Sequence, residues 1–263
     1  MADLYVVKIG GNVIDDEEKL SSFIESFASI KGKKILVHGG GKMATRVGEL
    51  LGVPQKMVEG RRITDAETLK VVTMVYAGYI NKNIVALLQA KGCNAIGLSG
   101  ADGNAVIAHK RKSENSSTDY GFAGDVDAVN APLLKNLLDD ELAIVITPIT
   151  HDGHGQLLNT NADTIAQELA KTLSVYYNAT LIYCFEKAGV LMDANDDNTL
   201  IPVINPDNYA QLRSEQKIFA GMIPKLDNAF SALNNGVKKV IIGKAEQLSL
   251  LIDGKTGTTI VNG

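Results

Sequence analysis

The sequence predicts a three-layer α/β fold, in which a mainly parallel central sheet lies between helices. Short runs rich in β-branched residues alternate with longer amphipathic stretches along the chain, and strands joined through helices usually pair in parallel. The chain has 263 residues, of which 45% are hydrophobic and 21% charged, and this suits one large α/β domain or two lobes.

Strands and helices alternate through the first half of the chain. The predicted strands are 4–9, 33–38, 94–99 and 142–149, and the predicted helices are 16–30, 42–52, 65–91 and 130–139. The longest of these helices has the spacing of a capping box at its start, with Thr64 and Glu67. Its apolar face repeats every three or four residues through Leu69, Val72, Tyr76, Tyr79, Asn83 and Leu87.

The second half continues the alternation. The predicted helices are 163–173 and 221–235, and the predicted strands are 181–185, 238–243 and 256–261. One stretch breaks the alternation, because residues 104–129 are polar at the centre and apolar at both ends. This pattern predicts a β-hairpin with an exposed tip near Lys112 to Thr118.

The charge of the chain excludes some classes of partner. Its net charge is −4, from 26 basic and 30 acidic residues, so nothing favours a nucleic acid or an anionic membrane as partner. We expect the basic run at 110–112 to be a solvated part of the hairpin tip. A small-molecule ligand at a local site is the remaining expectation.

The features that report on the compartment indicate a cytoplasmic protein. Cys93 and Cys184 lack any CxxC spacing, and we expect both to be buried thiols in a reducing environment. The N-terminus has no pattern of a secretory signal. The longest apolar runs, such as 142–146, have the length of a strand, whereas a membrane helix needs about 20 residues.

A lysine lies in the first strand, where burial is expected. Lys8 occurs in "LYVVKIGG", where only Ile9 separates it from Gly10 and Gly11, and an unpaired buried lysine is costly. A second glycine cluster, Gly39–Gly41, follows the strand 33–38. Glycines at the carboxyl ends of parallel strands let the backbone approach an anionic ligand. Two such clusters near a lysine favour a phosphate site over ordinary tight turns.

The phosphate motif is not a Walker A loop, because no G-x-x-x-x-G-K-[ST] sequence occurs in the chain. Gly39, Gly41 and Ala44 do match the G-x-G-x-x-A pattern of dinucleotide-binding turns. That pattern leaves Lys8 and Gly10 without a role. A nicotinamide-dependent dehydrogenase therefore stays open as an alternative.

Three motifs downstream add polar side chains. Arg61 and Arg62 offer guanidinium forks for a carboxylate, although adjacent arginines in a turn often face solvent. Asn159, Asn161 and Asp163 fall on one side of an extended segment, although an acid at a helix start is also ordinary capping. Lys225 is either a surface lysine or a second cation. Taken together, lysines, an aspartate and glycine turns suit phosphoryl transfer, which depends on positioning, positive charge and N–H donors.

The motifs "KIGGN", "VHGGG", "GRRIT", "GLSGADG", "NTNAD", "GVL" and "AGMIPK", in this order, resemble the amino acid kinase family. The match runs from Leu4 to the last predicted strand and is strongest to members that phosphorylate N-acetylglutamate in arginine biosynthesis. The resemblance implies that lobe 1–173 binds the acylated amino acid and forms the dimer. It also implies that lobe 174–263 binds ATP with Mg²⁺. The acceptor is the substrate's γ-carboxylate, which is ionised at neutral pH, so no general base is needed.

The resemblance further assigns residues to roles. Lys8 and Lys225 would stabilise the transferred phosphoryl group, and Asp163 would hold both lysines in place. The acylglutamate site would comprise Gly40, Gly41, Arg62 and Asn159. The ATP site would comprise Gly10, Gly11, Glu186, Lys187, Gly189, Val190, Leu191, Lys217, Ile218 and Phe219. Glu186 stands where relatives often have an aspartate, so the match is looser there.

The resemblance leaves the acid and the assembly open. Acetyl is the family default, whereas N-succinylglutamate, carbamate or aspartate as acceptor, and a ligand-sensing domain without activity, stay alternatives. Arginine-inhibited relatives carry an extra N-terminal helix, and only Met1 to Asp3 precede the first strand here. We therefore expect a homodimer, formed through the helix 65–91, that arginine does not inhibit. His151 and His154 lack further ligands nearby, so we expect no metal other than Mg²⁺ bound with ATP.

Overall fold

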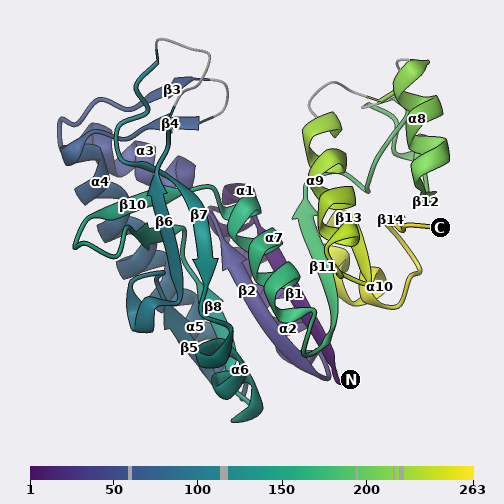
Figure 1. The fold of residues 1–263 in the computed structure, drawn as a ribbon, viewed down its shortest axis with the longest axis horizontal. Helices are drawn as coiled ribbons and strands as arrows, with labels where there is room; N and C mark the ends of the chain where they lie inside the picture. Colours follow the sequence, from purple (N-terminus) through teal and green to yellow (C-terminus); the bar gives the residue numbers. More distant parts are fainter. Residues whose placement is uncertain (59–60, 113–117, 194, 216, 219–221) are drawn as a thin grey trace.

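The centre of the molecule is a sheet of eight strands in the spatial order β12-β14-β13-β11-β1-β2-β8-β5 (Figure 1). The strands are β1 (Asp3–Ile9), β2 (Lys33–His38), β5 (Ala95–Leu98), β8 (Ala143–Ile146), β11 (Asn178–Phe185), β12 (Val203–Ile204), β13 (Lys239–Lys244) and β14 (Thr258–Ile260). The structure is a computed structural model that describes residues 1–58, 61–112, 118–193, 195–215, 217–218 and 222–263. Neighbours from β5 to β13 are parallel, and β14 is antiparallel to β13. The predicted mainly parallel sheet is confirmed.

Helices cover both faces of the sheet, as the three-layer prediction requires. One layer contains α2 (Glu17–Ser29), α4 (Ala66–Thr73), a π-helix (Met74–Ile80), α5 (Asn81–Ala90) and α10 (Leu248–Ile252). The other layer contains α6 (Ala131–Asp139), α7 (Ala162–Leu173) and α9 (Ile223–Asn234), with α8 (Pro206–Ser214) beside it. Two further helices, α1 (Gly11–Ile14) and α3 (Gly41–Leu50), begin where β1 and β2 end.

The side chains of β1 alternate between the two cores that these layers enclose. Leu4 and Val6 belong to the core under α6, α7 and α9, whereas Val7 and Ile9 belong to the core under α2. A strand buried on both faces accounts for the nearly continuous apolar run in the sequence. By the same alternation, Lys8 lies on the face of Leu4 and Val6 and is directed toward α7.

The predicted helix 65–91 is present as one helical run, but its middle third is a π-helix. Ala66–Ala90 is long and apolar enough to cross a membrane by length and composition alone, and 44% of its most apolar stretch is buried inside the molecule. Packing against α2 and the sheet accounts for that apolar face. Met74 and Tyr79 are exposed on its outer side.

The start of this helix differs from the predicted capping box. Asp65 caps α4, because its side chain accepts a hydrogen bond from the Thr68 N–H at 2.8 Å. Thr64 is fully buried instead, and its hydroxyl accepts a hydrogen bond from Asn159 at 3.0 Å. An aspartate next to the threonine takes over the capping role, which leaves the threonine available to a distant segment.

The predicted hairpin is present in the described part of residues 104–129, and it belongs to a small closed barrel. The barrel has the order β10-β7-β6-β9, with β6 (Val106–Lys110), β7 (Ala123–Val129), β9 (Ile149–His151) and β10 (Leu157–Thr160). Residues 113–117 of the predicted tip lie outside the described residues. The predicted strand 142–149 is divided into β8 and β9, because Pro148 has no N–H for a ladder hydrogen bond.

Several elements were not predicted from the sequence. They are α1, α8, α10, β10, β12, three short 3-10 helices and the short hairpin of β3 (Lys56–Val58) and β4 (Arg61–Ile63). The expected lobe boundary at residue 173 lies between α7 and β11, and the sheet continues across it because β11 pairs with β1. The carboxyl ends of β1, β2 and β11 therefore lie side by side at one edge of the sheet, which is where open α/β sheets bind ligands.

Candidate active site

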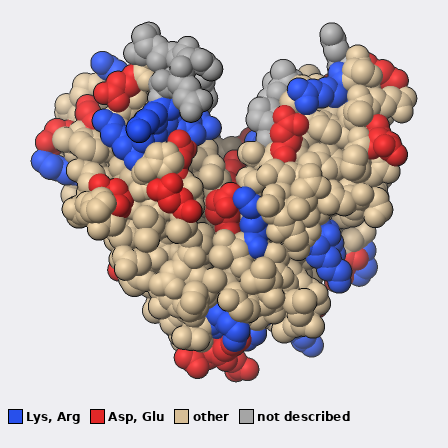
Figure 2. Space-filling view, in the orientation of Figure 1, with Lys and Arg blue, Asp and Glu red and all other residues tan. Residues whose placement is uncertain are grey.

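A deep cleft separates the two halves of the molecule on the face that Figure 2 shows. Two cavities at this edge contain most of the predicted site residues. The larger, of about 650 Å³, is lined by residues at the end of β11 and just after β1 and β11, together with Lys225 of α9. The smaller, of about 170 Å³, is lined by Gly39–Gly41, Arg62 and Asn159 among others. The strand ends thus divide the region into a C-terminal and an N-terminal binding space.

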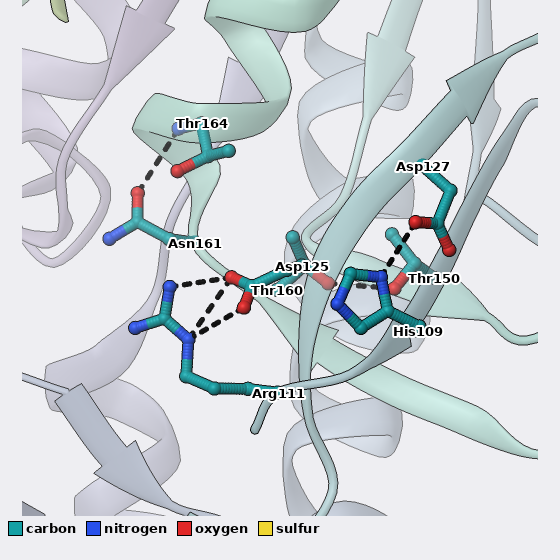
Figure 3. A network of polar contacts seen from close by, with 8 residues as sticks. All are labelled: His109, Arg111, Asp125, Asp127, Thr150, Thr160, Asn161 and Thr164. Atoms are coloured by element: carbon teal, nitrogen blue, oxygen red, sulfur yellow. Dashed lines mark hydrogen bonds and ion pairs between the residues drawn. The ribbon is translucent and has the colours of Figure 1, made fainter. Parts of the chain in front are cut away.

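Lys8 lies between these spaces and is paired with Asp163. Its side chain is 11% exposed, and its Nζ lies 2.8 Å from Asp163 Oδ1. The N-cap of α7 is Asn161, whose Oδ1 accepts hydrogen bonds from the Thr164 N–H (Figure 3) and from the Asp163 N–H. Because Asn161 caps the helix, the Asp163 carboxylate does not serve as the cap. The Asp163 carboxylate is therefore in an ion pair with Lys8 and is not the cap of α7.

Lys225 reaches the same place from the first turn of α9. Its Nζ lies 3.4 Å from the centroid of the Phe185 ring, and Lys8 Nζ lies 5.5 Å from it. The pKa of Lys225 is lowered, chiefly because the group is buried. The Asp163 carboxylate raises this pKa, and the positive charge of Lys8 lowers it, but the net direction is downward. The structure therefore brings both predicted lysines together, while Asp163 is in direct contact with Lys8 and acts on Lys225 through space.

The turn Gly39–Gly41 directs its three carbonyl groups into the protein. The donors are His38 Nδ1 to Gly39 O at 2.8 Å, the Ala44 N–H to Gly40 O at 3.0 Å and Arg62 Nη2 to Gly41 O at 2.8 Å. The first N–H groups of a helix such as α3 have no acceptor within the helix. Because this turn lines the smaller cavity, it offers backbone N–H donors to an anionic ligand there.

Two separate features favour glycine at position 40. Its φ of +149° is unfavourable for residues with a side chain. A Cβ atom at this position would lie 2.3 Å from Ile80 Cδ1 and 3.1 Å from Tyr76 Cδ1. Both of these residues belong to the π-helix, and such segments often occur at functional sites. The π-helix therefore packs directly against the turn Gly39–Gly41, which was predicted to bind substrate.

His38, for which the sequence predicted no role, is fully buried at the end of β2. Its Nδ1 donates to Gly39 O, and its Nε2 accepts a hydrogen bond from Asn81 Nδ2 at 3.3 Å. Asn81 also donates to Val145 O in β8 at 3.0 Å. Burial lowers the pKa of His38 from 6.5 to about 4, so the imidazole is neutral. This network links the glycine turn to the long helical run and to β8.

The two polar residues predicted for the substrate both line the smaller cavity. Arg62 is 8% exposed, and its Nη2 donates to Gly41 O at 2.8 Å and to Thr45 Oγ1 at 3.0 Å. Asn159 is held by its hydrogen bond to Thr64. Buried guanidinium and amide groups with fixed orientation are suited to recognise a carboxylate and an amide.

The prediction that the basic run 110–112 is a solvated tip was wrong for Arg111. Its Nε lies 2.9 Å from Asp125 Oδ2 and its Nη2 lies 2.5 Å from Asp125 Oδ1 (Figure 3). The Arg111 side chain is 23% exposed and lines the smaller cavity. The register of β6 against β7 brings the two residues together, and the predicted hairpin did not specify that register.

The residues predicted for ATP fall into two groups. Gly10, Glu186, Lys187, Gly189 and Leu191 line the larger cavity, and Gly11 begins α1 beside it. Within the described part of the chain, the remaining predicted residues lie elsewhere. Val190 and Ile218 are buried in the core, and Lys217 lies 2.7 Å from Glu215 in an ion pair. Phe219 lies outside the described residues.

The model of the amino acid kinase family matches residues 3–244. The chain belongs to this family. The acetylglutamate kinase of Cytophaga hutchinsonii is 56% identical over 263 residues, which cover 99% of either chain. That of Methanopyrus kandleri is 39% identical and covers 92% of this chain and 96% of that one. A Giardia carbamate kinase has a TM-score of 0.72 at 14% identity, covers 100% of this chain and 99% of its own, and shows the fold alone.

Membership of the amino acid kinase family decides between two uses of the glycine turns. The three-layer fold is the one expected, and the G-x-G-x-x-A match at Gly39, Gly41 and Ala44 is part of a kinase rather than of a dinucleotide-binding unit. The family match spans both lysines, the aspartate and both glycine turns. This amino acid kinase is thus an enzyme that transfers phosphoryl groups to a carboxyl group.

The neutral state of His38 predicts a loss of stability in acid. The unfolded chain takes up a proton as the pH falls through 6.5, whereas folded His38 takes it up only near pH 4. The unfolded state binds more protons between these values, so the free energy of unfolding should fall by about 2 kcal/mol from pH 7 to pH 5 through His38. Urea unfolding at both pH values measures it.

The matched variants are His38→Gln and His154→Gln. His38→Gln should lower stability at pH 7. It should also reduce the difference in the free energy of unfolding between pH 7 and pH 5 by about 2 kcal/mol. His154 is exposed in a turn, and its replacement should leave the difference unchanged. An unchanged difference in His38→Gln would show that the histidine titrates similarly in the folded and unfolded states.

Proposed function

We propose that this chain uses ATP to phosphorylate the γ-carboxylate of N-acetylglutamate, a step of arginine biosynthesis. The observation that carries the proposal is the convergence of Lys8, Asp163 and Lys225 at the strand ends between two cavities. The acetylglutamate kinases that are 56% and 39% identical over nearly the whole chain support this choice of acid.

The proposed reaction is a direct transfer between the two cavities. A γ-carboxylate oxygen of the acid attacks the γ-phosphorus of ATP, the bond to the β-phosphate bridging oxygen breaks, and ADP leaves with that electron pair. The acceptor is already an anion, so no proton has to be removed from it. Lys8 and Lys225 neutralise the charge on the transferred group, and Asp163 keeps Lys8 in place. Positioning and electrostatic stabilisation of this kind account for most phosphoryl-transfer catalysis.

The two substrates take one cavity each in this proposal. Arg62 binds the α-carboxylate of the acid, Asn159 binds its amide region, and the N–H groups of Gly40 and Gly41 face the reacting end. The larger cavity takes ATP along Gly10, Gly11 and the segment from Glu186 to Leu191. Roles for Val190, Lys217, Ile218 and Phe219 stay predictions. The lobes 1–173 and 174–263 would then be the acid-binding and nucleotide-binding parts.

Mg²⁺ enters the proposal with the nucleotide. Among the described residues, no group of three or more His, Cys, Asp or Glu side chains is placed to hold a metal ion. The proposed ligands of Mg²⁺ are therefore chiefly the phosphate oxygens of ATP, as is usual for this cation. Mg²⁺ bound in this way offsets negative charge on the phosphates, and the lysines act on the transferred group itself.

An assay of ADP release over a panel of acids tests the proposed function. N-acetylglutamate should give the highest kcat/KM, and N-succinylglutamate, glutamate, aspartate and carbamate should give lower values. Lys8→Ala should fold and lose about 10²–10³ in kcat, since it removes a preorganised donor. Lys255→Ala, an exposed lysine paired with Asp253, is the control and should keep full activity. A preference for the succinyl compound would identify the alternative acid, and near-normal turnover by Lys8→Ala would contradict the role of Lys8.

Arg62→Ala separates the two proposed cavities. The variant loses the guanidinium that binds the α-carboxylate, so the KM for the acid should rise at least tenfold, since hydrogen bonds to charged groups contribute about 1.5–3 kcal/mol. The KM for ATP should change much less. Initial rates with each substrate varied in turn provide the measurement. A change confined to the KM for ATP would contradict the assignment of Arg62 to the acid-binding cavity.

The assembly proposed for this cytoplasmic enzyme is a homodimer through the helical run Ala66–Ala90. Its outer side exposes Met74 and Tyr79, which are 55% and 63% accessible, and paired burial would remove this apolar surface from water. Light scattering coupled to size exclusion should give the mass of two chains. Met74→Glu with Tyr79→Glu should shift the mass toward one chain, and Leu50→Glu, at another exposed apolar position, should not. A hexamer, or inhibition by millimolar arginine, would contradict the expected assembly.

A further inference from the structure

Two cations share one carboxylate at the junction of the cavities. Lys8 is in an ion pair with Asp163 at 2.8 Å. In the described part of the chain, no carboxylate lies within ion-pair distance of Lys225 Nζ, whose close contact is the ring of Phe185. Burial and the neighbouring Lys8 both disfavour the charged form of Lys225. Something other than an ion pair therefore holds this ammonium group in place.

The ring of Phe185 has the position and orientation to do so. Its centroid lies 3.4 Å from Lys225 Nζ and 5.5 Å from Lys8 Nζ, within the range of cation–π attraction. Phe185 is the last residue of β11 and lines the larger cavity. Its negative π-face is thus presented at the point where the two cations meet.

Neighbouring contacts fix the direction of this ring. Tyr183 and Phe185 lie on the same face of β11, and their rings stack with centroids 6.1 Å apart and planes 19° apart. Tyr183 is the register partner of Lys8 in β1, and its hydroxyl donates to the Asp163 carbonyl at 3.4 Å. The ring of Phe185 is therefore aligned by the same strands and helix that hold the Lys8–Asp163 pair.

We propose that Phe185 is a positioning residue, whose ring face holds the Lys225 ammonium beside Lys8 before the nucleotide arrives. This inference rests on the proposed kinase function. Without the ring, Lys225 would be repelled by Lys8 and drawn toward water, and binding of ATP would have to recruit it. The charged groups that act on Lys225 are Lys8 of β1 and Asp163 of α7. Tyr183 stacks on the Phe185 ring, and the other titratable groups that line the same cavity are Cys184, Glu186 and Lys187.

Three variants separate the ring face from simple packing. Phe185→Leu keeps an apolar side chain but removes the π-face, and Phe185→Tyr keeps the π-face. Phe230→Leu is the control, because Phe230 stacks on Tyr209 in the same half of the molecule, with centroids 5.1 Å apart, and does not line the larger cavity in the described part of the chain. Melting temperatures of all three report whether each variant is folded.

The first readout does not need activity. Reductive ¹³C-methylation labels the lysines, Lys225→Arg identifies the Lys225 signal, and NMR titration follows its pKa. Phe185→Leu should lower the pKa of Lys225 by about half a unit to one unit, because the cation loses its attraction to the ring. Phe185→Tyr and Phe230→Leu should leave it unchanged. No change in Phe185→Leu, or the same change in Phe185→Tyr, would overturn the proposal.

The second readout is kinetic. Phe185→Leu should lower kcat/KM for ATP about tenfold, a loss that a desolvated cation–π contact can account for, and should move the alkaline limb of the pH profile toward lower pH. Phe185→Tyr should restore both. Equal losses of kcat/KM in Phe185→Leu and Phe185→Tyr would show that Phe185 acts only through packing, and would overturn the proposal. If the unmodified protein phosphorylates no acid of the panel, the proposed function fails, while the NMR titration still decides the role of Phe185.

Discussion

The ion pair between Lys8 and Asp163 is the contact on which the arrangement of the site depends. It joins β1 to the first turn of α7 at 2.8 Å, and the Asp163 carbonyl also accepts a hydrogen bond from Tyr183 of β11. Removing one partner of a fully buried pair typically costs about 3–5 kcal/mol. The Asp163 side chain is 25% exposed, so solvent screening makes the value smaller here. What the pair secures is the location of a cation where both cavities meet.

The two glycine turns are coupled to each other as well as to this pair. The Gly39 N–H donates to Ile9 O at 3.0 Å, which joins the start of one turn to the end of β1 directly before the other. His38, Ala44 and Arg62 bind the three carbonyl groups of the second turn. Once the carbonyls and the Gly39 N–H are satisfied inside the protein, the N–H groups of Gly40 and Gly41 are the polar atoms of this turn that remain for a ligand. Anion binding is expected at this turn because its carbonyl groups already have hydrogen-bond donors, whereas N–H donors are left for a ligand.

Local patterns in the sequence predicted the parts of this arrangement that depend on local rules. Residues close together in the chain determine the alternation in β1 and the order of helices and strands. They also show that Lys8 is an unexpected cation within an apolar strand. The contact of His38 with Asn81 joins residues 43 positions apart, and that of Asn159 with Thr64 joins residues 95 apart. The sequence around each of these residues gives no indication of its distant partner. Arg111 was misjudged for the same reason, because its partner lies across a hairpin.

The electrostatics of the site connect stability to function. Lys8 and Lys225 lie near a single carboxylate, so the junction carries excess positive charge before any ligand binds. That repulsion costs stability in the unliganded protein, and the aromatic face of Phe185 and the Asp163 carboxylate offset only part of it. A nucleotide adds negative charge at this point, so binding removes a repulsion in addition to forming new contacts. Sites of this kind are expected to conflict with the stability of the fold, and here the conflict is confined to the strand ends, where the two cavities meet.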